Sequence, residues 1–187
     1  METKQLIVGT ANNLLIERGF NAFSYKNISE QIGIKTSSIH YHFPSKTDLG
    51  IALIKSHHEI LKKTIEKNNE KTPLEKLKKL FLYYERLAIA HKVCIIGAFT
   101  SDINTLEESV RGEILTFANS VVDWANSILE EGQRQNVFKQ LFNTQLKAKL
   151  LIANLMSLVQ LARIEKNNHS FEQMMEMILD DLTIKTE

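Results

Sequence analysis

Three residues that stop α-helices divide the beginning of the chain into short pieces. Gly19 and Gly33 each follow a run with apolar residues at helical spacing, and glycine is common directly after the end of a helix. Pro44 ends a third run, because a residue that precedes proline disfavours helical geometry. The pattern therefore predicts three short helices before residue 45, over residues 4–18, 24–33 and 36–42.

The rest of the chain also favours helices. Of the 187 residues, 43% are hydrophobic and 24% are charged, which is ordinary for a globular protein. The chain has only seven Gly and two Pro, and neither strand-like alternation nor hairpin dipeptides are evident, so we predict an all-α fold. Further helices are expected from Ser45 to about Asn68, from Thr72 onward, from Leu106 to Gly132, over 146–164 and from Ser170, with residues 92–106 the least regular part.

The late helix over residues 146–164 is apolar around most of its circumference, so it must be covered on more than one side. The core of a single chain would need less apolar surface on this helix, which favours a second copy of the chain as the additional cover. A chain of 187 residues suits one core or a small domain fused to a larger one, and we predict a head over residues 1–61 and a larger helical body over residues 62–187.

Charge and cysteine content indicate the kind of partner that the chain binds and the compartment in which it works. The net charge is +1, but residues 1–63 hold eight Lys or Arg against five Asp or Glu, which fits a phosphate-contacting face on the head. Cys94 is the one cysteine, so no intrachain disulfide can form, and its apolar neighbours predict a buried structural role. No apolar stretch is long enough to span a bilayer, and we expect a cytoplasmic protein.

The third predicted helix has an unusual surface. It carries hydroxyls, two histidines and a tyrosine where a free-standing surface helix normally carries Lys, Glu or Gln, while Ile39 and Phe43 face inward. Three short helices with a glycine turn before the third match a helix-turn-helix, whose third helix enters the major groove. Short hydroxyls at its N-terminus permit a close approach to DNA, and the helix dipole favours phosphate there. The exposed face is predicted to contain Thr36, Ser37, His40 and Tyr41.

The segment from Ile32 to Leu49 closely resembles the recognition-helix signature of TetR-family transcriptional regulators. Residues 27–31 and 15–20 also resemble that family, so the likeness spans roughly residues 5–50 and includes the F-P-x-K ending. Beyond residue 60 it is weaker, although residues 94–97, Trp124 and residues 131–138 look like one subgroup of TetR ligand domains. Asn136 stands where that subgroup often has glycine, and His40 stands where many members have tyrosine.

The resemblance implies a homodimer whose last two helices form a four-helix interface, and a repressor that a small-molecule effector releases from a palindromic DNA operator. With a motif over about residues 24–43, the predicted DNA contacts are Tyr25, Lys26, Lys35, Thr36, Ser37, Ser38, His40, Tyr41, His42 and Lys46. The candidate effector-binding residues are Tyr84, Phe99, Phe117, Val121 and Trp124, each of which also suits a plain core position. No cofactor or metal ion is expected.

Two other functions stay open at this point. A helical small-molecule sensor that does not bind DNA would share the same body. An enzyme is disfavoured because no Ser-His-Asp order, H-E-x-x-H, CxxC pair or phosphate-binding Gly-rich loop is present. His40 and His42 are two residues apart and point to different sides of a helix, so a shared metal is disfavoured, and the adjacent His57 and His58 are expected to be solvated.

Overall fold

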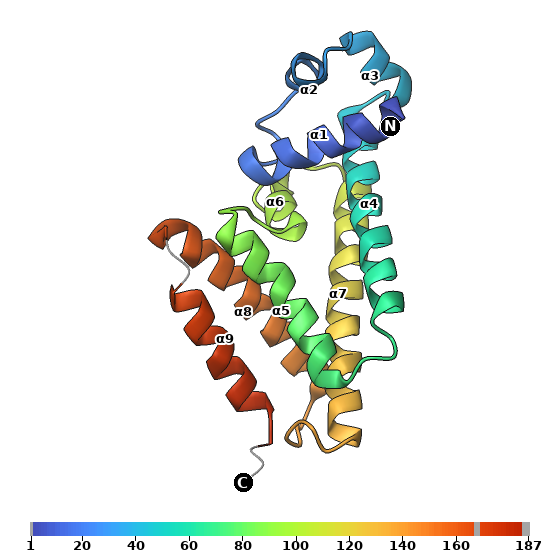
Figure 1. Cartoon of the computed structure of the whole chain (residues 1–187). Helices are drawn as coiled ribbons and strands as arrows, with labels where there is room; N and C mark the ends of the chain where they lie inside the picture. Colours follow the sequence, from blue (N-terminus) through green and yellow to red (C-terminus); the bar gives the residue numbers. More distant parts are fainter. Residues whose placement is uncertain (1, 167–168, 185–187) are drawn as a thin grey trace. The chain divides into compact units, whose positions relative to one another are not determined.

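The computed structural model describes residues 2–166 and 169–184, and this part of the chain is helical, as predicted, with no strand (Figure 1). Its elements are α1 (Thr3–Arg18), α2 (Tyr25–Ile32), α3 (Thr36–His42), α4 (Lys46–Lys67), α5 (Pro73–Ile89), α6 (Ile95–Thr100), the 3-10 turn η1 (Ile103–Thr105), α7 (Glu108–Arg134), α8 (Thr144–Glu165) and α9 (His169–Leu182). None of the described helices is long enough and apolar enough to cross a membrane.

The predicted helix stops of the first three helices are confirmed. Gly19 and Gly33 have φ values of 91° and 69°, a region that glycine enters without the steric cost of a side chain. The Gly33 N–H donates to the Ser29 carbonyl, at 2.9 Å, and closes the end of α2. After Pro44, the amide of Ser45 donates to the Asp48 carboxylate at 2.9 Å, which is the predicted cap of α4.

The chain forms two compact units. The first comprises residues 1–62 and 94–118, and the second comprises residues 63–93 and 119–187, so α4 and α7 contribute residues to both. The first unit thus combines the predicted head with residues 94–118, which the division after residue 61 assigns to the body. That division stays a prediction about function.

In the first unit, α1 packs against α2, α3 and α6 (Figure 1). Its core includes Ile39 and Phe43, which are 0% and 3% exposed and face inward as predicted. Residues 92–106 are more regular than expected, since they form α6 and η1. The sequence signal was weak because the residue that caps α6 is Cys94, whose sulfur accepts from the Gly97 amide, and cysteine is an uncommon cap. Cys94 itself is buried, and burial raises the pKa of its thiol.

In the second unit, α5 packs against α8 and α9, and α8 also packs against α9 (Figure 1). The start of α5 has the predicted cap, in which Thr72 and Glu75 exchange hydrogen bonds and Pro73 occupies the first turn. Lys76 on α5 is buried and lies 2.7 Å from the Glu131 carboxylate on α7. This ion pair links α5 to α7 within the second unit.

Candidate nucleic-acid interface

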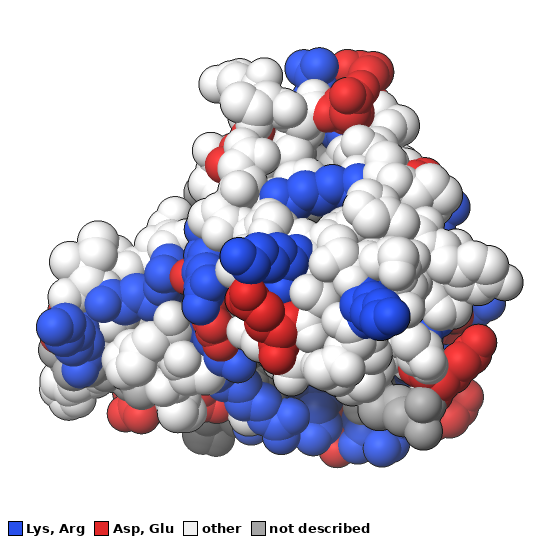
Figure 2. Space-filling view, turned by 90° about the horizontal axis from the view of Figure 1, so that it is seen from above, with Lys and Arg blue, Asp and Glu red and all other residues white. Residues whose placement is uncertain are grey.

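The predicted DNA-contacting residues differ in how far they reach the surface. Lys26 and Lys35 are exposed, and so are Thr36, Ser37, His40 and Tyr41 on α3, with Tyr41 84% exposed. Ser38, His42 and Lys46 are half-buried, whereas Tyr25 is buried. Figure 2, seen from above, shows Lys and Arg side chains separated by areas of uncharged surface. The polar face of α3 is thus exposed as a set, while Ile39 fixes its opposite side in the core.

His40 is exposed, yet its ring is oriented by two neighbours. Its Nδ1 lies 3.3 Å from the Pro44 carbonyl oxygen, and its ring centroid lies 4.7 Å from that of Tyr25. A carbonyl oxygen only accepts, so Nδ1 carries the proton and Nε2 of the neutral ring is an acceptor. An acceptor at this position can receive a hydrogen bond from an exocyclic amine of adenine or cytosine.

Tyr25 holds the turn between α3 and α4 together. Its hydroxyl donates to the carbonyl oxygens of Phe43 and Ser45, at 2.8 and 2.5 Å, so one proton is shared between two acceptors. Burial, reinforced by the charge of Asp48, raises the pKa of Tyr25 to about 12, which keeps the hydroxyl protonated. To donate to a DNA phosphate, this hydroxyl would have to leave both carbonyls.

Lys46 also has its charged group committed within the head. Its ammonium donates to the Phe23 carbonyl and lies 4.9 Å from the Phe20 ring centroid and 4.6 Å from that of Phe23. Burial lowers the pKa of Lys46, against the opposing effect of Asp102. The sequence places Lys46 directly after the recognition helix, but the direction of its side chain depends on residues that are distant in sequence.

The five candidate effector-binding residues are all at most 8% exposed. Phe99 and Phe117 belong to the first unit, whereas Tyr84, Val121 and Trp124 belong to the second. Phe99 packs on Phe20, with ring centroids 5.0 Å apart, which is a core contact. The sequence pattern does not separate an aromatic residue of a core from one that lines a pocket, so their role in effector binding stays a prediction.

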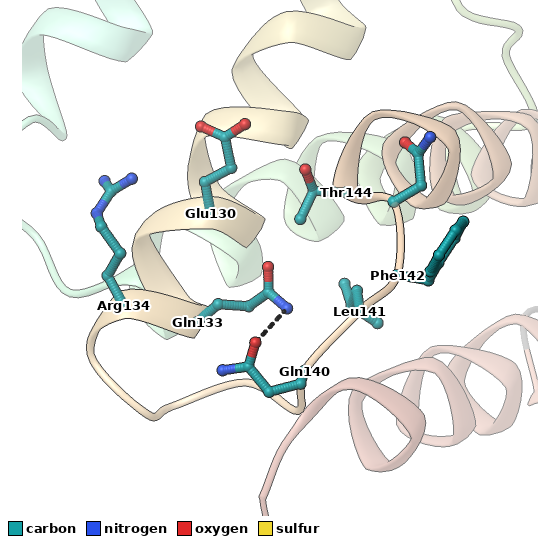
Figure 3. A pocket seen from close by; sticks show the side chains of 8 residues that line it. Glu130, Gln133, Arg134, Gln140, Leu141, Phe142 and Thr144 are labelled. Atoms are coloured by element: carbon teal, nitrogen blue, oxygen red, sulfur yellow. Dashed lines mark hydrogen bonds between the residues drawn. The ribbon is translucent and has the colours of Figure 1, made fainter.

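Sequence reasoning did not identify the hollow at the end of α7. It has a volume of about 580 Å³, and Figure 3 shows its side chains around the connection from α7 to α8. The Gln133 amide on α7 donates to the Gln140 side chain at 3.4 Å across this hollow. It is lined by Glu130, Gln133, Arg134, Gln140, Leu141, Phe142, Asn143 and Thr144, and none of the five candidate effector-binding residues is among them.

The expectation for His57 is wrong, because this side chain is not simply solvated. Its Nε2 lies 2.7 Å from the Asn12 side-chain oxygen on α1, and its ring faces Phe117 with centroids 6.3 Å apart. Burial lowers the pKa of His57 to about 4, so the ring is neutral at pH 7. A neutral ring that donates from Nε2 to Asn12 links α1 to α4 within the first unit.

Comparison with known proteins agrees with this architecture. Residues 7–53 match the family described as bacterial regulatory proteins, tetR family. A TetR-family transcriptional regulator from Agrobacterium tumefaciens is 30% identical, with 97% of each chain covered and a TM-score of 0.89. A TetR regulator from Legionella pneumophila is also 30% identical over 96% of each chain, with a TM-score of 0.87.

A known repressor also matches nearly the whole chain. The HTH-type transcriptional repressor DhaR of Mycobacterium sp. (strain GP1) is 23% identical over 98% of this chain and 94% of its own length. These likenesses favour a DNA-binding regulator over a sensor that does not bind DNA, and the family is one of regulators, not of enzymes. With the polar face of its third helix exposed and 97% of its length matched, the chain belongs to the TetR family of ligand-responsive transcriptional regulators.

Proposed function

We propose that the chain represses transcription in the cytoplasm as a homodimer on a palindromic operator, and that a small molecule bound by residues 62–187 releases it. The observation that carries the proposal is the polar face of α3, which is exposed while Ile39 and Phe43 anchor its other side. A helix that is fixed from behind can present side chains to base edges without losing its orientation.

The exposed side chains of the head differ in the DNA groups that they can contact. Thr36 and Ser37 bring short hydroxyls to the N-terminal end of α3, and His40 and Tyr41 provide longer polar groups one turn later. We assign base-edge or sugar contacts to these four. Phosphate contacts are assigned to Lys26 and Lys35, with Ser38 and His42 as half-buried flanking contacts. For Tyr25 and Lys46, the bonds within the head support a positioning role more than a direct one.

The surface of α8 supports dimer formation. One side of this helix is buried within the second unit, and the opposite side exposes apolar side chains at intervals of one to several turns. Met174 and Met177 on α9 are exposed as well. A second copy that packs on the exposed stripe would remove it from water and place two recognition helices on one DNA site. The stripe consists of Leu146, Leu150, Leu161 and Ile164, which are 62%, 53%, 43% and 78% exposed.

The test is binding to the DNA upstream of the chain's own gene, measured by fluorescence anisotropy between 50 and about 300 mM salt. We expect a sequence-selective complex whose affinity falls with salt, and a footprint of two half-sites centred ~34–36 Å apart. Thr36→Ala is expected to reduce operator affinity more than non-operator affinity, with Thr116→Ala on α7 as the control. A complex that shows no sequence preference, or none at all, would contradict the proposal.

The effector is sought separately. Native mass spectrometry of the protein purified from its own host should reveal a retained small molecule, and adding that molecule should dissociate the operator complex. Binding energy for the effector must differ between the DNA-bound and free conformations for release to follow. A molecule that binds but leaves operator affinity unchanged would remove the release step from the proposal and leave DNA binding intact.

A further inference from the structure

The loop between α1 and α2 is bonded to residues far along the chain. The backbone N–H of Asn21 donates to the Asp102 carboxylate at 2.9 Å, and the Asn21 side-chain amide donates to the Thr105 hydroxyl at 2.6 Å. These partners lie 81 and 84 residues downstream, one in the turn after α6 and the other in η1. All four groups belong to the first unit, so the loop is attached to a second element of that unit.

An aromatic contact reinforces this attachment. The Phe20 ring lies 5.0 Å from the Phe99 ring of α6 and 5.9 Å from the ring of Phe23. The Phe20 ring also lies against Gly50 of α4, where an added Cβ would approach it to 3.0 Å. Phe20 therefore contacts both α4 and α6, and an added Cβ at position 50 would require its ring to shift by a few tenths of an ångström.

Lys46 completes the arrangement at the first residue of α4. Its ammonium is bonded to the Phe23 carbonyl and lies over the Phe20 and Phe23 rings, an environment that removes much of its water. Desolvation disfavours the charged form, and the Asp102 carboxylate opposes that effect. The same carboxylate thus holds the Asn21 amide and balances the Lys46 charge.

We infer that Lys46 and Asp102 are positioning residues for operator binding, which fix the α1–α2 loop and the turn before α4 so that α3 is held in one orientation. The inference rests on the proposed operator binding. Lys46 links the turn after α3 to the backbone of Phe23 in the α1–α2 loop. Asp102, directly before η1, holds Asn21 of the same loop. In this arrangement the Lys46 ammonium does not contact a phosphate.

Simple electrostatics and positioning give opposite expectations for Asp102. Removing a carboxylate from a DNA-binding head reduces repulsion of phosphate, so charge alone predicts equal or tighter binding. Loss of a positioning group predicts weaker operator binding and poorer discrimination. Asp102→Asn is the informative change, since it keeps an oxygen acceptor for the Asn21 amide and removes the charge near Lys46. Glu17→Gln is the matched control, because Glu17 is an exposed acid on α1.

For Lys46 the distinguishing readout is the salt dependence. A lysine on a phosphate contributes ~0.9 to the slope of log affinity against log salt concentration. Lys46→Met keeps the aliphatic stem and removes the charge, and we expect it to lower operator affinity about tenfold with the slope unchanged. Lys35→Met, on an exposed lysine, should lower the slope by ~0.9 and weaken operator and non-operator DNA together.

The experiment measures operator and non-operator affinity of the full-length chain for these variants over the same salt series, with thermal unfolding as a check on folding. Thr105→Val serves as a milder variant, because Thr105 is exposed and loses only its hydroxyl bonds. Asp102→Asn and Thr105→Val should both reduce discrimination between the two DNAs, by about tenfold and about threefold.

Three results overturn the inference. One is a decrease of about one in the salt slope of Lys46→Met, with equal loss on both DNAs, which would place the ammonium on a phosphate. A second is that Asp102→Asn and Thr105→Val both bind the operator with the same affinity as Glu17→Gln. The third is that the unaltered chain selects no operator. That result would contradict the proposed function and this inference together, and it would be seen before any variant is measured.

Discussion

The hydroxyl of Tyr25 on α2 donates to the carbonyl oxygen of Phe43, 2.8 Å away, in the turn that separates the recognition helix from α4. Tyr25→Phe leaves that buried carbonyl without its partner, so we expect the free energy of unfolding to fall by about 1–3 kcal/mol in urea denaturation. Tyr41→Phe is the control, since Tyr41 is 84% exposed and its hydroxyl does not hold this turn. Equal stability of the two variants would show that the Tyr25 bond contributes nothing.

Gly33 is needed for its backbone conformation and not because a side chain would lack room. Its φ is 69°, and an added Cβ would meet no heavy atom within 4 Å, so the cost of Gly33→Ala comes from the left-handed conformation alone. We expect a loss of about 1–2 kcal/mol in the free energy of unfolding. Gly9→Ala is matched, because Gly9 also has open space but lies within α1, and there alanine should stabilise by about 0.5–1 kcal/mol. Changes of the same sign at both positions would contradict this account.

The exposed stripe on α8 predicts the oligomeric state. Leu150→Glu places a charge in the proposed interface, where it would be buried without a partner, and should convert the dimer to monomers in analytical ultracentrifugation. Leu115→Glu on α7 is the control, with Leu115 61% and Leu150 53% exposed. If Leu150→Glu sediments as the unaltered chain does, another surface forms the dimer.

His57 predicts a pH dependence of stability. Burial lowers its pKa from 6.5 to about 4, so the unfolded chain binds a proton before the folded chain does. The stability contributed by the neutral ring is complete above pH 6.5 and is lost as the pH falls from there toward 4, by at most about 3 kcal/mol. His57→Gln keeps a donor for Asn12 and does not titrate, so its urea midpoint should fall less over this range. An equal fall of the urea midpoint in His57→Gln and in the unaltered chain would assign the effect to other groups.

The first three helices could be predicted closely because their ends depend on local chemistry. Gly19 and Gly33 permit a positive φ, Pro44 restricts the backbone of the residue before it, and the Ser45 cap involves a residue only three positions away. The start of α6 directly after Cys94 was missed, since no common cap residue marks it. The TetR resemblance also transferred well to the whole chain, because its signature combines several restricted positions in one segment.

The directions of side chains were less predictable. Periodicity correctly places Ile39 and Phe43 inward, because four residues make about one helical turn. It gives no information on Lys46 or His57, whose partners Phe23 and Asn12 lie 23 and 45 residues away. The effector site stays a prediction for the same reason, since buried aromatics such as Phe99 serve a core as readily as a pocket.

The long-range bonds of Asn21 also affect how the protein is made. The ribosome completes α1, α2 and α3 early, but Asp102 and Thr105 are added 81 and 84 residues after Asn21. At ~5–20 residues per second, roughly 4–16 s pass before the loop can reach these partners. The head is therefore synthesised first, and the bonds that hold its α1–α2 loop can form only after more than half of the chain has been made.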